Sequence, residues 1–114
     1  MKGGAGDRAA LEDMLRYARR VQAHTVAGRS SLDDDLSRDG ILYELAIVGE
    51  AAGRVSDELR AAHPEVPWRP IVGQRNILVH VYDQLSVDRL WLAVEAVPQL
   101  ISQIEHILEE LGEP

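Results

Sequence analysis

Apolar residues recur every three or four positions along most of this chain, which is the periodicity of amphipathic helices. The first such stretch runs from Leu11 to Val26. Asp7 precedes it and is a suitable N-cap, and Gly28 follows it as a stop signal. The sequence therefore predicts a first helix between Asp7 and Gly28, followed by a connection at residues 30–36.

A second helix is expected to begin near Ser37 and to run to about Ala52. Its apolar stripe is broad, which is typical of a buried helix. It contains Gly40, Gly49 and Gly53, and each glycine costs about 1 kcal/mol relative to alanine within a helix. We expect another helix to approach closely at these glycines, because such packing would offset that cost.

Two further helices follow. Ser56 is placed to cap a short helix, which the His-Pro pair at 63–64 ends. Pro67 then occupies a favoured starting position for a third main helix, which is expected to continue to about Tyr82. Gly73 interrupts that helix near its start.

The C-terminal segment predicts one long helix. Ser86 is its expected cap, apolar residues continue at helical spacing almost to its end, and Pro98 should kink it. No segment alternates convincingly as a strand. The fold class is therefore expected to be all-α: an up-down bundle of four main helices plus a short helix, in one domain at residues 7–114 after a flexible tail at residues 1–6.

Composition limits the function classes. The 114 residues are 46% hydrophobic and include no cysteine, which excludes disulfides, thiolate metal sites and cysteine nucleophiles. No apolar run approaches the roughly 20 residues of a membrane span, and the N-terminus does not resemble a signal peptide, so a cytoplasmic location is expected. The net charge of −7 argues against a general nucleic-acid binder, although the four arginines between residues 54 and 75 make the middle of the chain locally positive.

The candidate chemistry is concentrated in Arg75, Asn76, His80 and Tyr82. Arginine can hold a phosphodiester, and histidine can act as general base or acid on a ribose 2′-hydroxyl or a leaving oxygen. Asn76 lies one helical turn before His80 and could orient the imidazole. Arg75 and His80 are about 140° apart on a single helix, so a cleft edge or a two-fold interface would be needed to bring them together. The alternative interpretation is local capping and packing without chemistry.

No metal site is predicted. The four histidines lie far apart in the sequence, and no metal-binding, phosphate-binding or serine-hydrolase motif is present.

These residues resemble the hallmark of the HEPN superfamily, which is arginine, four to six residues, histidine, one residue and tyrosine. Segments 47–52, 67–73 and 87–91 are similar to segments of the HepT-like toxins, in the same order. The resemblance implies helical bundles that form homodimers and join the hallmark residues of both subunits in one cleft. It implies that Arg75 and His80 are the ribonuclease residues, with Asn76 as a polar neighbour.

The resemblance also implies a partner, a small nucleotidyltransferase antitoxin. Tyr82 matches the tyrosine that this partner adenylylates in some systems, and a bulky anionic AMP beside the cleft would repel RNA phosphates. Two residues depart from the family pattern. Gln74 stands where methionine is common, and Val81, where a small or polar residue is usual, narrows the approach to His80 and Tyr82.

Two functions from different classes follow. The first is a metal-independent endoribonuclease toxin that needs no cofactor and no membrane, with RNA, a second copy of the chain and the nucleotidyltransferase as partners. The alternative is a non-enzymatic helical module that binds this nucleotidyltransferase and is modified by it. Alanine at Arg75 or His80 should abolish cleavage only under the first hypothesis. A purely structural bundle is a third possibility.

Overall fold

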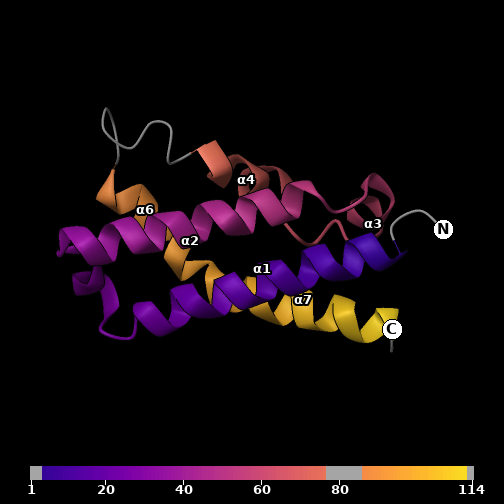
Figure 1. Cartoon of the computed structure of the whole chain (residues 1–114), viewed down its shortest axis with the longest axis horizontal. Helices are drawn as coiled ribbons and strands as arrows, with labels where there is room; N and C mark the ends of the chain where they lie inside the picture. Colours follow the sequence, from indigo (N-terminus) through magenta and orange to yellow (C-terminus); the bar gives the residue numbers. More distant parts are fainter. Residues whose placement is uncertain (1–3, 77–85, 113–114) are drawn as a thin grey trace.

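Long helices lying along a common axis form the body of the structure. The computed structural model describes residues 4–76 and 86–112. Helices α1 (Gly4–His24) and α2 (Asp35–Gly53) run antiparallel to each other, and α7 (Val97–Leu111) also packs against α1 (Figure 1). The molecule is correspondingly elongated, with extents of 44 × 26 × 20 Å.

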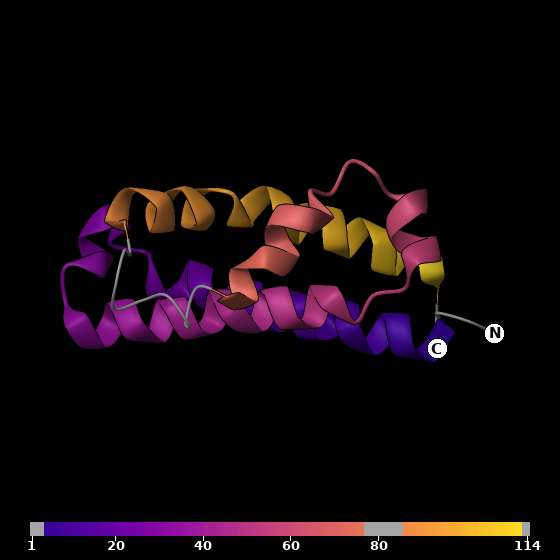
Figure 2. The same cartoon turned by 90° about the horizontal axis from the view of Figure 1, so that it is seen from above.

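Shorter helices complete the bundle. The 3-10 helix η1 (Gly28–Leu32) connects α1 to α2, and α6 (Val87–Glu95) leads into α7. After α2 come α3 (Asp57–Ala62), α4 (Trp68–Gly73) and the 3-10 helix η2 (Gln74–Asn76). Figure 2 shows α4 and η2 slanting down onto α2. All regular elements of the described ranges are helices, which confirms the predicted all-α bundle.

The core is aliphatic, as the composition predicts, and burial of each large side chain contributes about 1.5–3 kcal/mol. Among the fully buried side chains are Leu11, Met14, Leu42, Leu45, Ile104 and Ile107. Val26 was expected on the same apolar stripe as Leu11, but it is 84% exposed. The reason is that α1 ends at His24, before the chain reaches Val26.

Asp7 was predicted to cap the first helix, and this prediction is wrong. Helix α1 begins at Gly4, so Asp7 lies in its first turn and residues 4–6 of the expected tail are helical. The buried Asp7 carboxylate accepts hydrogen bonds from the backbone N–H of Ser56 at 2.8 Å and from its hydroxyl at 2.7 Å. Ser56 caps α3 as predicted, because its Oγ accepts from the N–H of Leu59. Asp7 therefore ties α1 to α3.

The junction between α1 and α2 also differs from its prediction. Helix α1 ends at His24, and Gly28, with φ +81°, begins η1 rather than ending the helix. Helix α2 begins at Asp35, two residues before the predicted start, because the Asp34 carboxylate accepts from the N–H of Ser37 at 2.9 Å.

The predicted kink in the last helix lies at Ala96, where the chain divides into α6 and α7. Pro98 is in the first turn of α7, where its missing N–H removes no helical hydrogen bond. Ser86 caps α6 as predicted, by accepting from the N–H of Arg89. In the described ranges no helix combines the length and hydrophobicity that a membrane span requires.

The third main helix is interrupted at the predicted glycine. The α-helical part ends at Gly73, and the tighter η2 continues to Asn76. The rest of the expected helix, up to Tyr82, lies outside the described residues.

Candidate functional site

Gly49 allows the segment that carries Arg75 to lie directly against α2. A Cβ on Gly49 would be 2.6 Å from the carbonyl oxygen of Ile71 and 2.8 Å from the backbone nitrogen of Arg75. Both distances are shorter than any normal contact of a Cβ, and both involve backbone atoms that cannot turn away. The close approach expected at the glycines of α2 is therefore confirmed here. At Gly40, by contrast, a Cβ would meet nothing within 4 Å.

The side chain of Arg75 reaches the C-terminal end of α2. A Cβ on Gly53, the last residue of α2, would lie 3.5 Å from Nη1 of Arg75. Arg60 is at the same end and donates to the carbonyl oxygens of Gly53 at 3.1 Å and Val55 at 3.0 Å. A helix C-terminus carries partial negative charge and attracts cations, so it helps to hold both guanidinium groups there.

Arg75 is available to an anion. Its side chain is exposed, and it forms no ion pair with any residue in the described ranges. The nearby Arg54 differs, because its guanidinium pairs with Asp13 at 3.0 Å. An exposed guanidinium that has no ion-pair partner among the described residues is suited to bidentate binding of a phosphate.

The structure places only part of the predicted site. Asn76 is exposed and ends η2, directly after Arg75. His80 and Tyr82 lie outside the described residues, so their proximity to Arg75 remains a prediction.

Two carboxylates of α2 take different positions. Glu50, which lies in the family-like segment 47–52, is exposed. The buried one is Glu44, whose Oε1 and Oε2 lie 3.0 Å and 2.8 Å from Nδ1 of His24. No local pattern in the sequence links these two residues, because the pair joins the end of one helix to the middle of the next.

Gln74 lies on the inner side of η2. Its Oε1 is fully shielded from solvent and has no hydrogen-bond partner among the residues that the structure describes. Gln74 thus carries a shielded polar group directly before Arg75 in η2. It stands at one of the two positions that depart from the family pattern.

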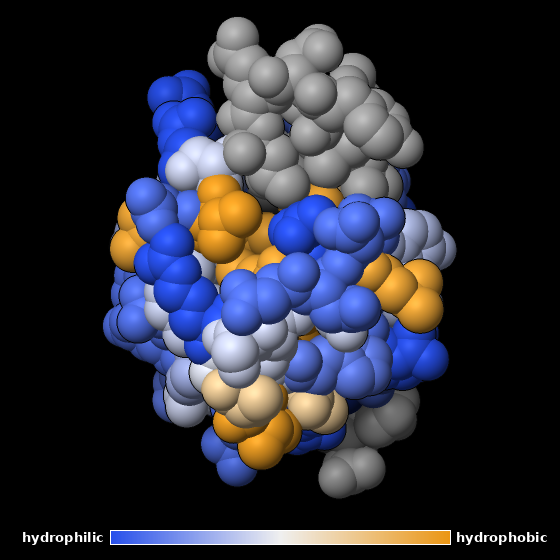
Figure 3. All heavy atoms as spheres, turned by 90° about the vertical axis from the view of Figure 1, so that its left-hand side faces the viewer, coloured by the Kyte–Doolittle hydropathy of each residue, from blue (hydrophilic) through white to orange (hydrophobic). Residues whose placement is uncertain are grey.

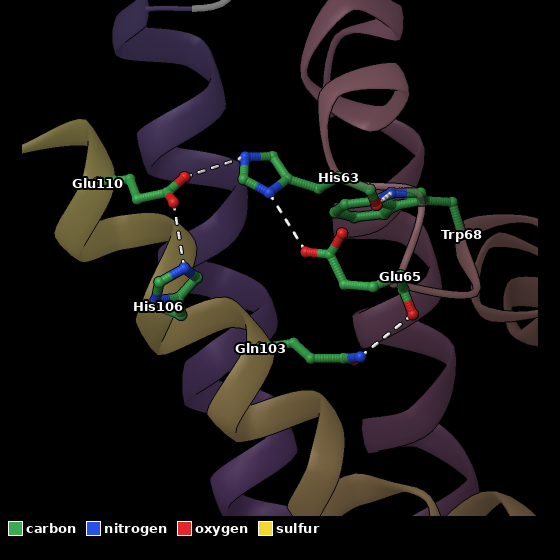
Figure 4. A network of polar contacts seen from close by, with 6 residues as sticks. All are labelled: His63, Glu65, Trp68, Gln103, His106 and Glu110. Carbon is green, nitrogen blue, oxygen red and sulfur yellow. Dashed lines mark hydrogen bonds and ion pairs between the residues drawn. The ribbon is translucent and has the colours of Figure 1, made fainter.

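Two histidines that are far apart in sequence meet at one carboxylate (Figure 4). Nε2 of His63 is 3.5 Å from Oε1 of Glu110, and Nε2 of His106 is 3.0 Å from its Oε2. Nδ1 of His63 is also 3.3 Å from Oε2 of Glu65. The hydrogen bond of Glu65 with its own backbone, followed by that with His63, lowers the pKa of the Glu65 carboxyl. This cluster joins α7 to the connection between α3 and α4, and the described ranges contain no group of three or more residues suited to a metal ion.

Comparison with known proteins identifies the family. Residues 12–107 match the family described as ribonuclease HepT-like. The chain belongs to the HepT-like family. The match includes nearly the whole bundle and all four candidate site residues, and it confirms the predicted membership of the HEPN superfamily.

Relatives of the HepT-like chain carry ribonuclease names. A candidate RNase of Methanocaldococcus jannaschii is 33% identical over 101 residues, which cover 86% of this chain and 93% of the relative. A protein of Thermococcus cleftensis named as a probable ribonuclease HepT is 29% identical, over 85% of this chain and 91% of its own. A candidate RNase of Caldanaerobacter subterraneus is 31% identical over 68% of this chain and 74% of its own. The comparison with solved structures found no significant match.

Proposed function

We propose that this chain is the endoribonuclease toxin of a toxin–antitoxin pair, and that it cleaves RNA in the cytoplasm without a metal ion. The observation that carries the proposal is the match of residues 12–107 to the HepT-like ribonucleases. The exposed Arg75 guanidinium, on a backbone segment that lies directly against α2, supports it.

The proposed chemistry needs one cation and one proton carrier. Arg75 binds the non-bridging oxygens of a phosphodiester and stabilises the charge that develops on them. His80 removes the proton of the ribose 2′-hydroxyl, whose oxygen then bonds to phosphorus while the bond to the 5′-oxygen breaks. The leaving oxygen takes up a proton, and the other product is a 2′,3′-cyclic phosphate. Asn76 positions the His80 imidazole.

Cleavage by unmodified protein, in the presence of EDTA, tests the proposal. Arg75→Ala and His80→Ala should each reduce the rate by about 10²-fold or more, as loss of a charge-stabilising group or a general base does. Arg20→Ala is the matched control, because Arg20 is exposed on α1 and rests on the ring of Tyr17. Intact RNA with the unmodified wild type would contradict the enzyme hypothesis and favour the binding module.

The proposal includes a homodimer. Figure 3 views the end of the molecule at which α1 ends and α2 and α6 begin, and hydrophobic side chains are visible there among hydrophilic ones. The segments at this end contribute Val26, Leu36 and Val87, which are 84%, 82% and 36% exposed. A second copy of the chain that covered this end would remove these apolar side chains from water.

The remaining partner is a nucleotidyltransferase that silences the toxin by adenylylating Tyr82. Incubation with the cognate enzyme and ATP should add one AMP unit to the intact mass and abolish cleavage, because the added phosphate repels RNA. Tyr82→Phe should prevent both effects. Tyr43→Phe is the control, since Tyr43 is 50% exposed on α2 and offers the enzyme another accessible hydroxyl. Modification that persists in Tyr82→Phe would show that the tyrosine was assigned wrongly.

A further inference from the structure

A cavity of about 220 Å³ lies between α4 and the junction of α6 with α7, with α2 as its floor. Most of its wall is apolar and includes Val48, Ile71, Val97 and Leu100. Its polar groups include the amides of Gln74 and Gln103. Nothing in the proposed cleavage chemistry uses this cavity.

The amides at the cavity have unused hydrogen-bonding capacity. Gln74 Oε1 is shielded from solvent and lacks a donor among the described residues. Gln103 is held in place because its Nε2 donates to the carbonyl oxygen of Glu65 at 3.1 Å (Figure 4). An amide has two N–H donors and one acceptor, so Gln103 retains an acceptor and a second N–H. A shielded acceptor without a donor is unfavourable, and a ligand with an N–H at its edge would satisfy it.

This lining matches a nucleobase better than it matches a charged metabolite. A nucleobase has flat apolar faces for the wall and N–H and C=O groups at its edge for the amides. The lining residues include Glu65 but no lysine or arginine, within the part of the chain that the structure describes. A phosphate would therefore remain outside, where the positive charge is.

The cavity and Arg75 share one backbone turn. Gln74 lines the cavity, and the next residue is Arg75, whose guanidinium lies at Gly53. Along α2, Leu45 on the cavity wall and Gly53 are eight residues apart, which corresponds to roughly 12 Å at 1.5 Å per residue. A base in the cavity would thus belong to a nucleotide next to the one whose phosphate contacts Arg75.

We propose that this cavity binds a nucleobase through the amides of Gln74 and Gln103. It thereby holds a nucleotide adjacent to the scissile phosphate and gives the enzyme a preference for the base at that position. The RNA part of this inference rests on the proposed function. The recognition chemistry also accommodates a free nucleoside, which the test distinguishes from a base in RNA.

The test is titration of the full-length protein with adenosine, guanosine, cytidine and uridine, and with short oligoribonucleotides, followed through the side-chain amide resonances of Gln74 and Gln103. We expect saturable shifts. Gln74→Met removes the amide acceptor while keeping a side chain of similar volume, and Ala93→Leu places a larger side chain in the cavity. Each substitution should weaken binding of the probes at least about tenfold. Gln22→Met and Ala9→Leu are the controls, since both residues are exposed on α1.

Each outcome decides a different point. Shifts with oligoribonucleotides alone indicate a base of RNA, and Gln74→Met should then raise the KM of cleavage more than it lowers kcat. Shifts with nucleosides in a protein that cleaves no RNA would support the base site while the ribonuclease proposal fails. Absence of saturable shifts with every probe would overturn the inference even if the wild type cleaves RNA. So would a finding that Gln74→Met and Ala93→Leu each bind the probes as tightly as the wild type does.

Discussion

Single residues decide how Arg75 is presented, and Gly49 is the clearest of them. The backbone of the segment around Arg75 lies so close to α2 that only a glycine fits beneath it. The atoms that a side chain would meet are the Ile71 carbonyl oxygen and the Arg75 nitrogen, and neither can move without shifting the whole segment. A glycine that is unfavourable for the helix is therefore required for the close approach of this segment to α2.

We expect Gly49→Ala to lower the free energy of unfolding. Alanine gains about 1 kcal/mol of helix propensity, but overpacking against backbone typically costs about 1–3 kcal/mol, so the net change should be a loss of up to about 2 kcal/mol. The displaced segment should also carry Arg75 away from the end of α2 and slow RNA cleavage. Denaturant titration and the cleavage assay measure the two effects.

Gly40→Ala is the matched control on the same helix. A Cβ there meets nothing within 4 Å, so the propensity gain should stand alone and raise the free energy of unfolding by up to about 1 kcal/mol. If both substitutions stabilise the protein equally, Gly49 does not set the approach of the Arg75 segment to α2.

Whole elements are positioned by their caps, and α2 shows this best. Asp34 precedes the helix and accepts from the backbone N–H of Ser37. That backbone hydrogen bond, together with the one from the Ser37 hydroxyl, lowers the pKa of the Asp34 carboxyl below its ordinary value of 3.8. The charged cap consequently stabilises the folded state most where Asp34 is ionised in both the folded and the unfolded chain.

The contribution of the Asp34 cap to the stability of the fold depends on pH. Because the folded pKa of Asp34 is lowered, its contribution is complete above pH 3.8 and is lost as the pH falls through the folded pKa. Asparagine also caps helices but does not titrate. The difference in Tm between wild type and Asp34→Asn should therefore shrink below pH 3.8. Asp33→Asn is the control at an exposed neighbour that does not cap α2; a similar convergence for this variant would show that the Asp34 cap is not the cause.

Helices were predictable where the signals are local. Ser56, Ser86 and Gly73 stand in the sequence where α3 and α6 begin and α4 ends, because caps and glycines act within a few residues. The prediction that Asp7 caps the first helix was wrong, because the partner of its carboxylate is Ser56, 49 residues away. The candidate site divides in the same way: residue type and spacing suffice to propose Arg75 and Asn76, whereas the shielded amide of Gln74 depends on long-range packing.

At the scale of the whole molecule, the net charge of −7 opposes RNA binding, so phosphate binding would depend on a few arginines. Asp13 pairs with Arg54, and Glu105 pairs with Arg19, which leaves Arg75 among the less compensated cations of the described ranges. A second copy of the chain would double the number of such arginines at a shared cleft. The proposed homodimer is therefore a means of binding phosphate as well as of bringing Arg75 and His80 together.

A dimeric active site predicts that activity depends on protein concentration. Below the Kd of the dimer, the dimeric fraction is proportional to concentration, so cleavage per chain should fall about tenfold for each tenfold dilution. Sedimentation over the same range should show conversion of dimer to monomer. Two copies joined in tandem by a flexible linker are the control, because the linker keeps their effective concentration high and should preserve cleavage on dilution. A monomer that retains full activity would mean that one chain contains the complete cleft.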